Sequence, residues 1–69
     1  MSRRSPEALY RRACREFVSS AAGRRRSFRT FLEAARAGHG ESMNEVGSAL
    51  YDGEGVARDR RAAFRWYRR

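Results

Sequence analysis

Cys14 and His39 are the only cysteine and the only histidine of the chain, and together they form the only candidate pair for nucleophilic catalysis. Such catalysis also needs a third group that orients the base. Cys14 belongs to the apolar stripe of a predicted helix, where a buried thiol is usually inert. His39 lies between two glycines in a predicted turn. The sequence therefore favours a core thiol and a turn histidine over a catalytic dyad, and we predict that the protein is not an enzyme.

Two carboxylates, Glu41 and Glu45, are four residues apart and share one face of a predicted helix. Such a pair can perform acid–base chemistry, but it more often forms a solvated edge. One Cys and one His cannot supply the four ligands of a zinc site. The segment Gly53-Glu54-Gly55 is not typical of a phosphate-binding loop, because a helix rather than a strand precedes it. We predict no catalytic residue, no metal site and no cofactor.

Charge is the strongest compositional signal of the 69 residues. All sixteen basic residues are arginine, the formal net charge is +8 and the pI is about 11.4. Arginine binds carboxylate and phosphate groups through two parallel hydrogen bonds, although a GC-rich genome would also encode arginine wherever a solvated cation is needed. Residues 1–37 carry +7, residues 38–57 carry −4 and residues 58–69 carry +5. An acidic segment between basic ends can pair with a neighbouring unit or with a foreign partner.

The arginine clusters keep one alternative function open, that of a basic helical protein that binds nucleic acid through its phosphates. The candidate phosphate-binding residues are Arg11, Arg15, Arg24, Arg25 and Arg26. Against this alternative, no predicted helix has the polar pattern of a recognition helix. Three cations at a helix N-terminus also oppose the helix dipole.

Apolar residues recur at spacings of three and four, which predicts an all-α protein without strands. Ser5 and Pro6 are suited to cap and begin the first helix, and Gly23 is expected to end it. Asp59 is a suitable N-cap for the last helix. The helices are expected at residues 5–20, 24–37, 41–51 and in the segment that follows Asp59.

The chain is one domain at most, with no apolar run long enough to span a bilayer. Arg3 and Arg4 resemble the start of a twin-arginine signal, but arginines interrupt the segment where the apolar region should follow. A lone thiol without an export signal suggests the cytoplasm.

Two helical hairpins repeat along the chain. Phe28 and Phe64 are 36 residues apart, as are Phe31 and Tyr67. A period in the thirties with paired helices is typical of an α-solenoid. At the crossing of each helix pair the sequence places a small residue, Ala13 or Gly47, which allows the close separation of packed helices.

Residues 34–69 resemble the Sel-one-like repeats, which are relatives of the tetratricopeptide repeats. The resemblance rests on the junction Ala34–Gly47, on the loop Gly53–Asp59 and on the second helix Ala63–Arg69. It implies a disordered N-terminus at 1–4, a degenerate capping hairpin at 5–37 and a repeat at 38–69 whose C-terminal end is truncated. The paired alanines of the repeat would follow Arg69, so we expect the N-terminal part of a longer array.

The resemblance also implies a non-catalytic adaptor that binds a protein or peptide on a concave surface lined by the first helix of each unit. The contact residues expected on that surface are Arg12, Glu16, Asn44 and Ser48. The arginine excess suggests an acidic partner, with nucleic acid as the less favoured choice and no membrane.

Five residues are expected to have structural roles: Gly47, Gly53, Gly55, Asp59 and Trp66. The two glycines of the loop can take positive φ and let the chain reverse tightly. Trp66 and Tyr67 are large anchors at the C-terminal edge, and an uncovered aromatic edge also allows self-association.

Overall fold

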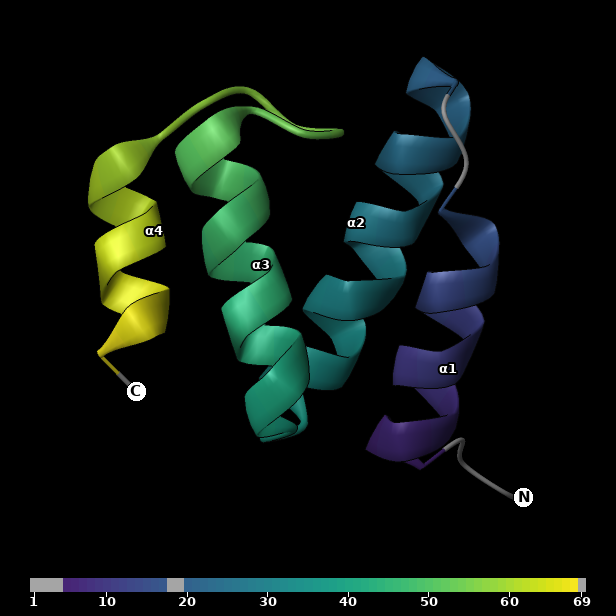
Figure 1. The fold of residues 1–69 in the computed structure, drawn as a ribbon. Coiled ribbons are helices and arrows are strands. Elements are labelled where there is room, and N and C mark those ends of the chain that lie inside the picture. Colours follow the sequence, from purple (N-terminus) through teal and green to yellow (C-terminus); the bar gives the residue numbers. More distant parts are fainter. Residues whose placement is uncertain (1–4, 18–19, 69) are drawn as a thin grey trace.

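The computed structural model describes residues 5–17 and 20–68 (Figure 1). It contains four helices: α1 (Pro6–Glu16), α2 (Ala21–Arg36), α3 (Gly40–Asp52) and α4 (Arg60–Tyr67). No strand occurs in these two ranges, which confirms the all-α class. Each helix packs against the next one along the chain, so the helices lie side by side in a flat arrangement (Figure 1). The expected N-terminal disorder at 1–4 lies outside the described residues, as do Val18, Ser19 and Arg69.

Side-chain caps define where all four helices begin, and two of these caps were predicted. Ser5 accepts a hydrogen bond from the backbone N–H of Ala8 at 3.1 Å, and Pro6 follows it at the first helical position. Asp59 accepts from the N–H of Ala62 at 3.0 Å. Each cap satisfies a donor that the first helical turn leaves unpaired. Both predicted starts are therefore confirmed.

The boundary between α1 and α2 differs from the prediction. α1 ends at Glu16 rather than at Ser20, and α2 begins at Ala21. Ser20 is the N-cap of α2, because its hydroxyl accepts from the N–H of Gly23 at 3.0 Å. Gly23 is thus a buried residue of the first turn of α2, not the residue that ends α1.

The junction between α2 and α3 is a tight turn at Gly38, whose φ is +95°. His39 caps α3: its Nδ1 lies 3.3 Å from the backbone N of Ser42 and 2.8 Å from the Ser42 hydroxyl. The turn predicted around His39 is confirmed. The cap by a histidine explains why α3 begins one residue earlier than expected.

Small residues let neighbouring helices approach closely. Ala13 is fully buried, and its carbonyl accepts a hydrogen bond from the Ser27 hydroxyl of α2 at 2.9 Å. On the other side of the molecule, a Cβ on Gly47 would lie 2.7 Å from Cε1 of Tyr67. Both predicted crossing points are confirmed. The core between them contains Leu9, Phe31, Ala34, Ala35, Val46, Leu50 and Ala63.

The loop between α3 and α4 lies against α2. Gly53 and Gly55 both have a φ of +77°, as their positions predicted. A Cβ on Gly55 would lie 2.3 Å from the carbonyl oxygen of Arg24. Val56 packs against the core. The loop therefore packs the second hairpin against the first.

The C-terminal helix covers α3 only in part. Trp66 is partly buried and packs against the core, as its anchor role requires. Phe64 and Tyr67 remain 54% and 44% exposed, and the Phe64 ring contacts the ring of Tyr51 with centroids 6.1 Å apart. An aromatic edge is therefore present at this end, but Phe64 and Tyr67 form it rather than Trp66 and Tyr67, because Trp66 packs against the core.

Candidate protein-binding groove

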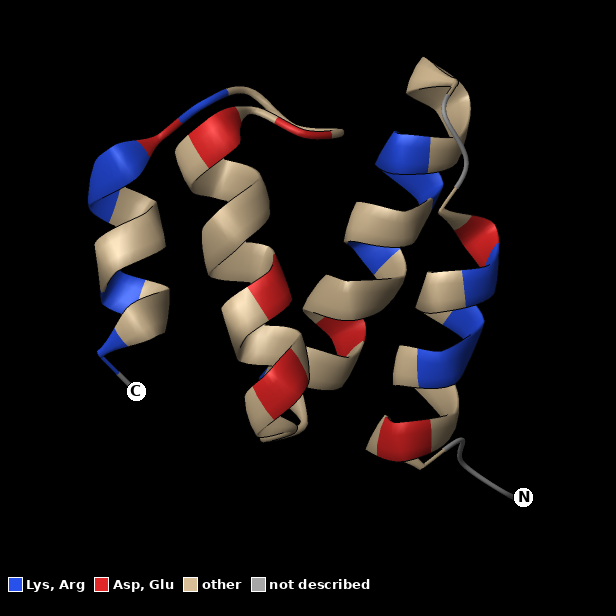
Figure 2. Ribbon diagram, viewed as in Figure 1, with Lys and Arg blue, Asp and Glu red and all other residues tan. Residues whose placement is uncertain are grey.

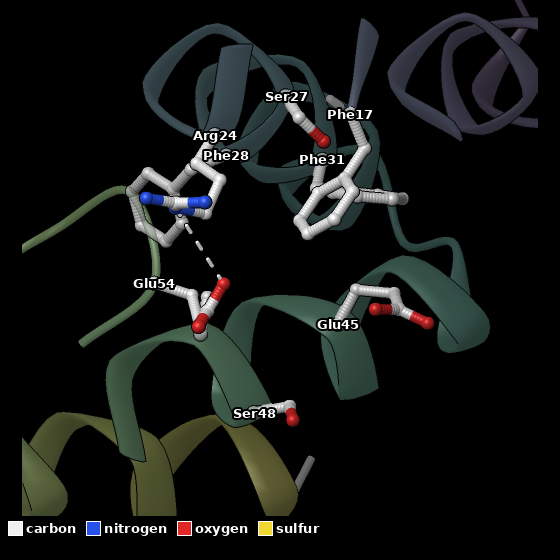
Figure 3. Close-up of a pocket in the computed structure, with 9 residues that line it drawn as sticks. Phe17, Arg24, Ser27, Phe28, Phe31, Glu45, Ser48 and Glu54 are labelled. Carbon is white, nitrogen blue, oxygen red and sulfur yellow. Dashed lines mark ion pairs between the residues drawn. The ribbon is translucent and has the colours of Figure 1, made fainter. Parts of the chain in front are cut away.

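An open pocket of about 160 Å³ lies where the end of α1 approaches α2, α3 and the loop after α3 (Figure 3). We call it the aromatic pocket. Its lining consists of Phe17, Arg24, Ser27, Phe28, Phe31, Glu45, Ser48, Ala49 and Glu54. The phenylalanines come from α2 and the end of α1, and the two carboxylates come from α3 and the loop after it (Figure 3).

The apolar part of the pocket combines a fixed floor with an open wall. Phe31 is 8% exposed, and its ring is held by the Tyr10 ring at a centroid distance of 5.6 Å. Phe28 is partly buried against the same core. Phe17 is the C-cap residue of α1 and is 50% exposed. The pocket therefore offers aromatic surface that the chain itself does not cover.

The polar rim is mainly acidic. Glu54 forms an ion pair with Arg24, with Oε1 and Nε 3.8 Å apart. Glu45 is exposed and makes no hydrogen bond or ion pair within residues 5–17 and 20–68. Figure 2 shows that the acidic residues gather on α3 and its following loop, whereas α4 and much of α1 carry arginine. Glu45 is thus an unneutralised carboxylate at the mouth of an apolar pocket.

Beside the pocket, Tyr10 joins the candidate catalytic residues in one cluster. Its ring lies 5.1 Å from the ring of His39. The pKa of the Tyr10 hydroxyl is raised, first by the charge of Cys14, then by burial and a hydrogen bond with Cys14, and also by the charges of Glu41 and Glu45. Glu41 and Glu45 are therefore near enough to Tyr10 to act on its hydroxyl, but Cys14 and burial act on it more strongly.

The prediction that Cys14 is a core thiol is wrong, because the residue is exposed. It lies on the edge of the apolar stripe of α1, and only α2 makes extensive contact with this helix. Cys14 and His39 share no hydrogen bond in the described part of the chain, and Nδ1 of His39 is engaged by Ser42. The geometry of a dyad is therefore not formed. Glu41 lies 4.0 Å from Nε2 of His39 and is otherwise solvated.

Only one of the four expected contact residues lines the pocket, namely Ser48. Asn44 is exposed on the same helix but is not part of the lining. Arg12 and Glu16 pair with each other on α1, with Nε and Oε2 3.1 Å apart. The Thr30 hydroxyl donates to the other oxygen of Glu16 at 2.6 Å.

The Glu16 carboxylate has a structural partner on α2 and is mostly buried. Burial alone would raise its pKa, but hydrogen bonds from Thr30 and Arg12 and the charges of Arg12 and Arg26 outweigh that effect and lower the pKa. Through its bond to Thr30, Glu16 joins α1 to α2. Neither Arg12 nor Glu16 lies in the aromatic pocket with Ser48.

The arginines proposed to bind phosphate do not form one surface, although Arg24 and Arg25 share a hollow beside the loop glycines Gly53 and Gly55. Arg24 lines the aromatic pocket. Arg25 and Arg26 line a further hollow of about 180 Å³, together with Ala22 and Arg29. Arg11 and Arg15 are exposed on α1. The spacing 22, 25, 26 and 29 follows one helical face, so Arg29 could have been found from periodicity.

Several residues of the pocket were not among the predicted site residues. Phe28 and Phe31 were identified by their spacing of 36 residues from Phe64 and Tyr67, which does not indicate a pocket. Phe17 and Glu54 meet only because the end of α1 and the loop after α3 converge on α2. Sequence periodicity describes one helix at a time and cannot predict that convergence.

No helix in the described ranges is long and apolar enough to cross a bilayer. Within the same ranges, no three His, Cys, Asp or Glu side chains are grouped as metal ligands would be. Comparisons of the chain with protein-family models, with curated proteins and with solved structures give no match. The resemblance to Sel-one-like repeats therefore stays a prediction, supported only by its own sequence motifs and compatible with the all-α hairpins.

Proposed function

We propose that the chain is a non-catalytic protein-interaction module that binds a peptide segment of a partner protein in the aromatic pocket. The single observation that carries this proposal is the open pocket itself, which is lined by a half-exposed Phe17 and by the mostly buried Phe28 and Phe31. Ligand sites are typically concave, mainly apolar and edged by a few polar groups. The aromatic pocket has all three properties.

The size of the pocket suits one large side chain. Its volume of about 160 Å³ is close to the roughly 150 Å³ of an apolar protein cavity that holds benzene. A bound peptide would anchor one residue here and extend along α3, where Ser48 and Asn44 are exposed. The total charge of the chain suggested an acidic partner. The rim of the aromatic pocket is itself acidic, so the pocket does not favour an acidic side chain.

A displayed library of random peptides, selected on the immobilised chain, tests this function directly. The expected result is a set of related peptides whose binding is lost when Ala49→Trp fills the pocket. Ala57→Trp, at an exposed loop position, is the matched control and should leave binding unchanged. Selection of no peptides, or of peptides that bind Ala49→Trp equally well, would contradict the proposal.

Nucleic-acid binding is the second candidate, and one observation favours it. Arg25, Arg26 and Arg29 line one shallow hollow on α2, where their guanidinium groups could neutralise a phosphate backbone. Fluorescence anisotropy with a random duplex and a random single strand at about 50 mM salt tests this candidate, because phosphate contacts are strongest at low salt. Absence of binding under those conditions would exclude it.

A further inference from the structure

We propose that the aromatic pocket receives an arginine side chain from a basic segment of the partner protein. This inference rests on the proposed function, since it names the chemistry of the partner that occupies the same pocket. The net charge of +8 suggests an acidic partner, whereas this inference assigns a basic segment to the pocket.

The three phenylalanines provide the first part of an arginine site. A guanidinium group over the face of an aromatic ring is attracted by the ring quadrupole, and the aliphatic stem of arginine covers apolar surface while its charged head stays solvated. Phe17 presents a ring that is 50% exposed, and Phe31 forms a fixed surface that is held by Tyr10. Ala49 leaves space between α3 and these rings.

The carboxylates provide the second part. Glu54 is neutralised by Arg24, at a separation of 3.8 Å. Glu45 has no ion-pair partner among the residues that the structure describes, so its carboxylate is the acid left for a ligand. A guanidinium group pairs with a carboxylate through two parallel hydrogen bonds, which a lysine ammonium cannot do.

The charge around the pocket also favours a cation. Residues 38–57 contain four acids and no basic residue other than the histidine, so acidic residues are concentrated on α3 and the start of its following loop (Figure 2).

A foreign partner is favoured over a second copy of this chain. Each copy carries +8, so two copies repel each other as they approach. A partner protein that is neutral or acidic apart from one short basic segment avoids this repulsion. We therefore assign the pocket to a foreign segment.

The test uses four peptides, Gly-Ser-Ala-X-Ala-Ser-Gly, in which X is Arg, Lys, Leu or Glu. Each is titrated into the ¹⁵N-labelled chain, and the dissociation constant is taken from the shifts of the backbone amides. We expect the Arg peptide to bind about threefold tighter than the Leu peptide and about tenfold tighter than the Glu peptide, as an aromatic contact and one exposed ion pair would give.

Two variants locate the effect. Glu45→Gln removes the free carboxylate and should weaken the Arg peptide about two- to fivefold, while leaving the Leu peptide unchanged. Phe17→Ala should weaken the Arg peptide about threefold or more, because it removes the exposed ring without opening the core. Glu33→Gln, at an exposed site on α2 outside the pocket, is the control and should change neither affinity.

The possible failures are distinguishable. If the Leu peptide binds as tightly as the Arg peptide, the arginine site is wrong while the proposed function stands. If no peptide binds and the library selection also gives none, the proposed function itself fails. If the chain alone sediments as an oligomer that Glu45→Gln dissociates, a second copy occupies the pocket and the assignment to a foreign segment is overturned.

Discussion

The ring of Tyr67 lies against the backbone of Gly47, so close that a Cβ on Gly47 would be 2.7 Å from Cε1 of that ring. This contact fixes how α4 lies on α3. It also explains why a glycine occupies the interior of a helix, where it is about 1 kcal/mol less favourable than alanine.

A double-mutant cycle tests this relationship. In the Tyr67→Ala background, Gly47→Ala should stabilise the chain by up to about 1 kcal/mol, because only the helix propensity changes. In the native background the same substitution displaces the ring of Tyr67. Its effect on the free energy of unfolding should therefore be less favourable than in the Tyr67→Ala background by at least about 0.5 kcal/mol. Urea unfolding measures all four chains. Equal effects of Gly47→Ala in both backgrounds would show that the two residues are independent.

The loop glycines give a prediction with an internal control. Gly38 and Gly55 both have positive φ, but a Cβ on Gly38 meets nothing within 4 Å, whereas on Gly55 it would lie 2.3 Å from a carbonyl oxygen. Gly38→Ala should destabilise the chain by about 1–2 kcal/mol through backbone conformation alone. Gly55→Ala should destabilise it by about 2–4 kcal/mol, because the clash with Arg24 adds to that cost.

The measurement is the free energy of unfolding of both variants in urea. Similar values for Gly38→Ala and Gly55→Ala would mean that the loop does not pack against α2. In that case Glu54 would not be held at the rim of the aromatic pocket.

Acid should weaken the contact between α1 and α2. The pKa of Glu16 is lowered in the folded chain below its ordinary value of 4.5. A lowered folded pKa stabilises the fold at pH values above the unfolded pKa, and this contribution is lost as the pH falls through the folded pKa. Urea unfolding between neutral pH and pH 3 should therefore show a loss of stability that Glu16→Gln reduces. A Glu16→Gln chain with the same pH profile as the native chain would contradict this role.

The exposure of Cys14 predicts rapid chemical modification. A thiol reagent such as dithionitrobenzoate should react with the folded chain without denaturant, since the side chain is exposed. Cys14→Ser should change the free energy of unfolding by less than about 0.5 kcal/mol, as is usual at surface positions. Slow modification that urea accelerates would instead place the thiol in the core.

Much of the fold could be predicted because its signals are local. Ser5 and Asp59 satisfy helix N–H groups three residues later, and the loop glycines take the conformations that their position requires. The same local logic failed where two signals competed, since Gly23 suggested a helix end but Ser20, three residues earlier, caps a new helix. His39 was missed as a cap because histidine is not among the preferred N-cap residues.

The candidate site could not be predicted in the same way. An apolar stripe shows which face of α1 is inward, but not how much of that face the next helix covers, so Cys14 was assigned to the core although it is exposed. Phe17 and Glu54 are 37 positions apart and meet only through the packing of α2 between their elements. Such a pocket depends on tertiary contacts for which helical periodicity carries no signal.

We propose that the aromatic pocket is the binding surface of this chain. The most direct measurement is a ¹H–¹⁵N shift map of the labelled chain with the Arg peptide. We predict that the largest shifts occur at the backbone amides of Phe17, Phe28, Ala49 and Glu54. Shifts centred on Arg25, Arg26 and Arg29, or no shifts at saturating peptide, would contradict it.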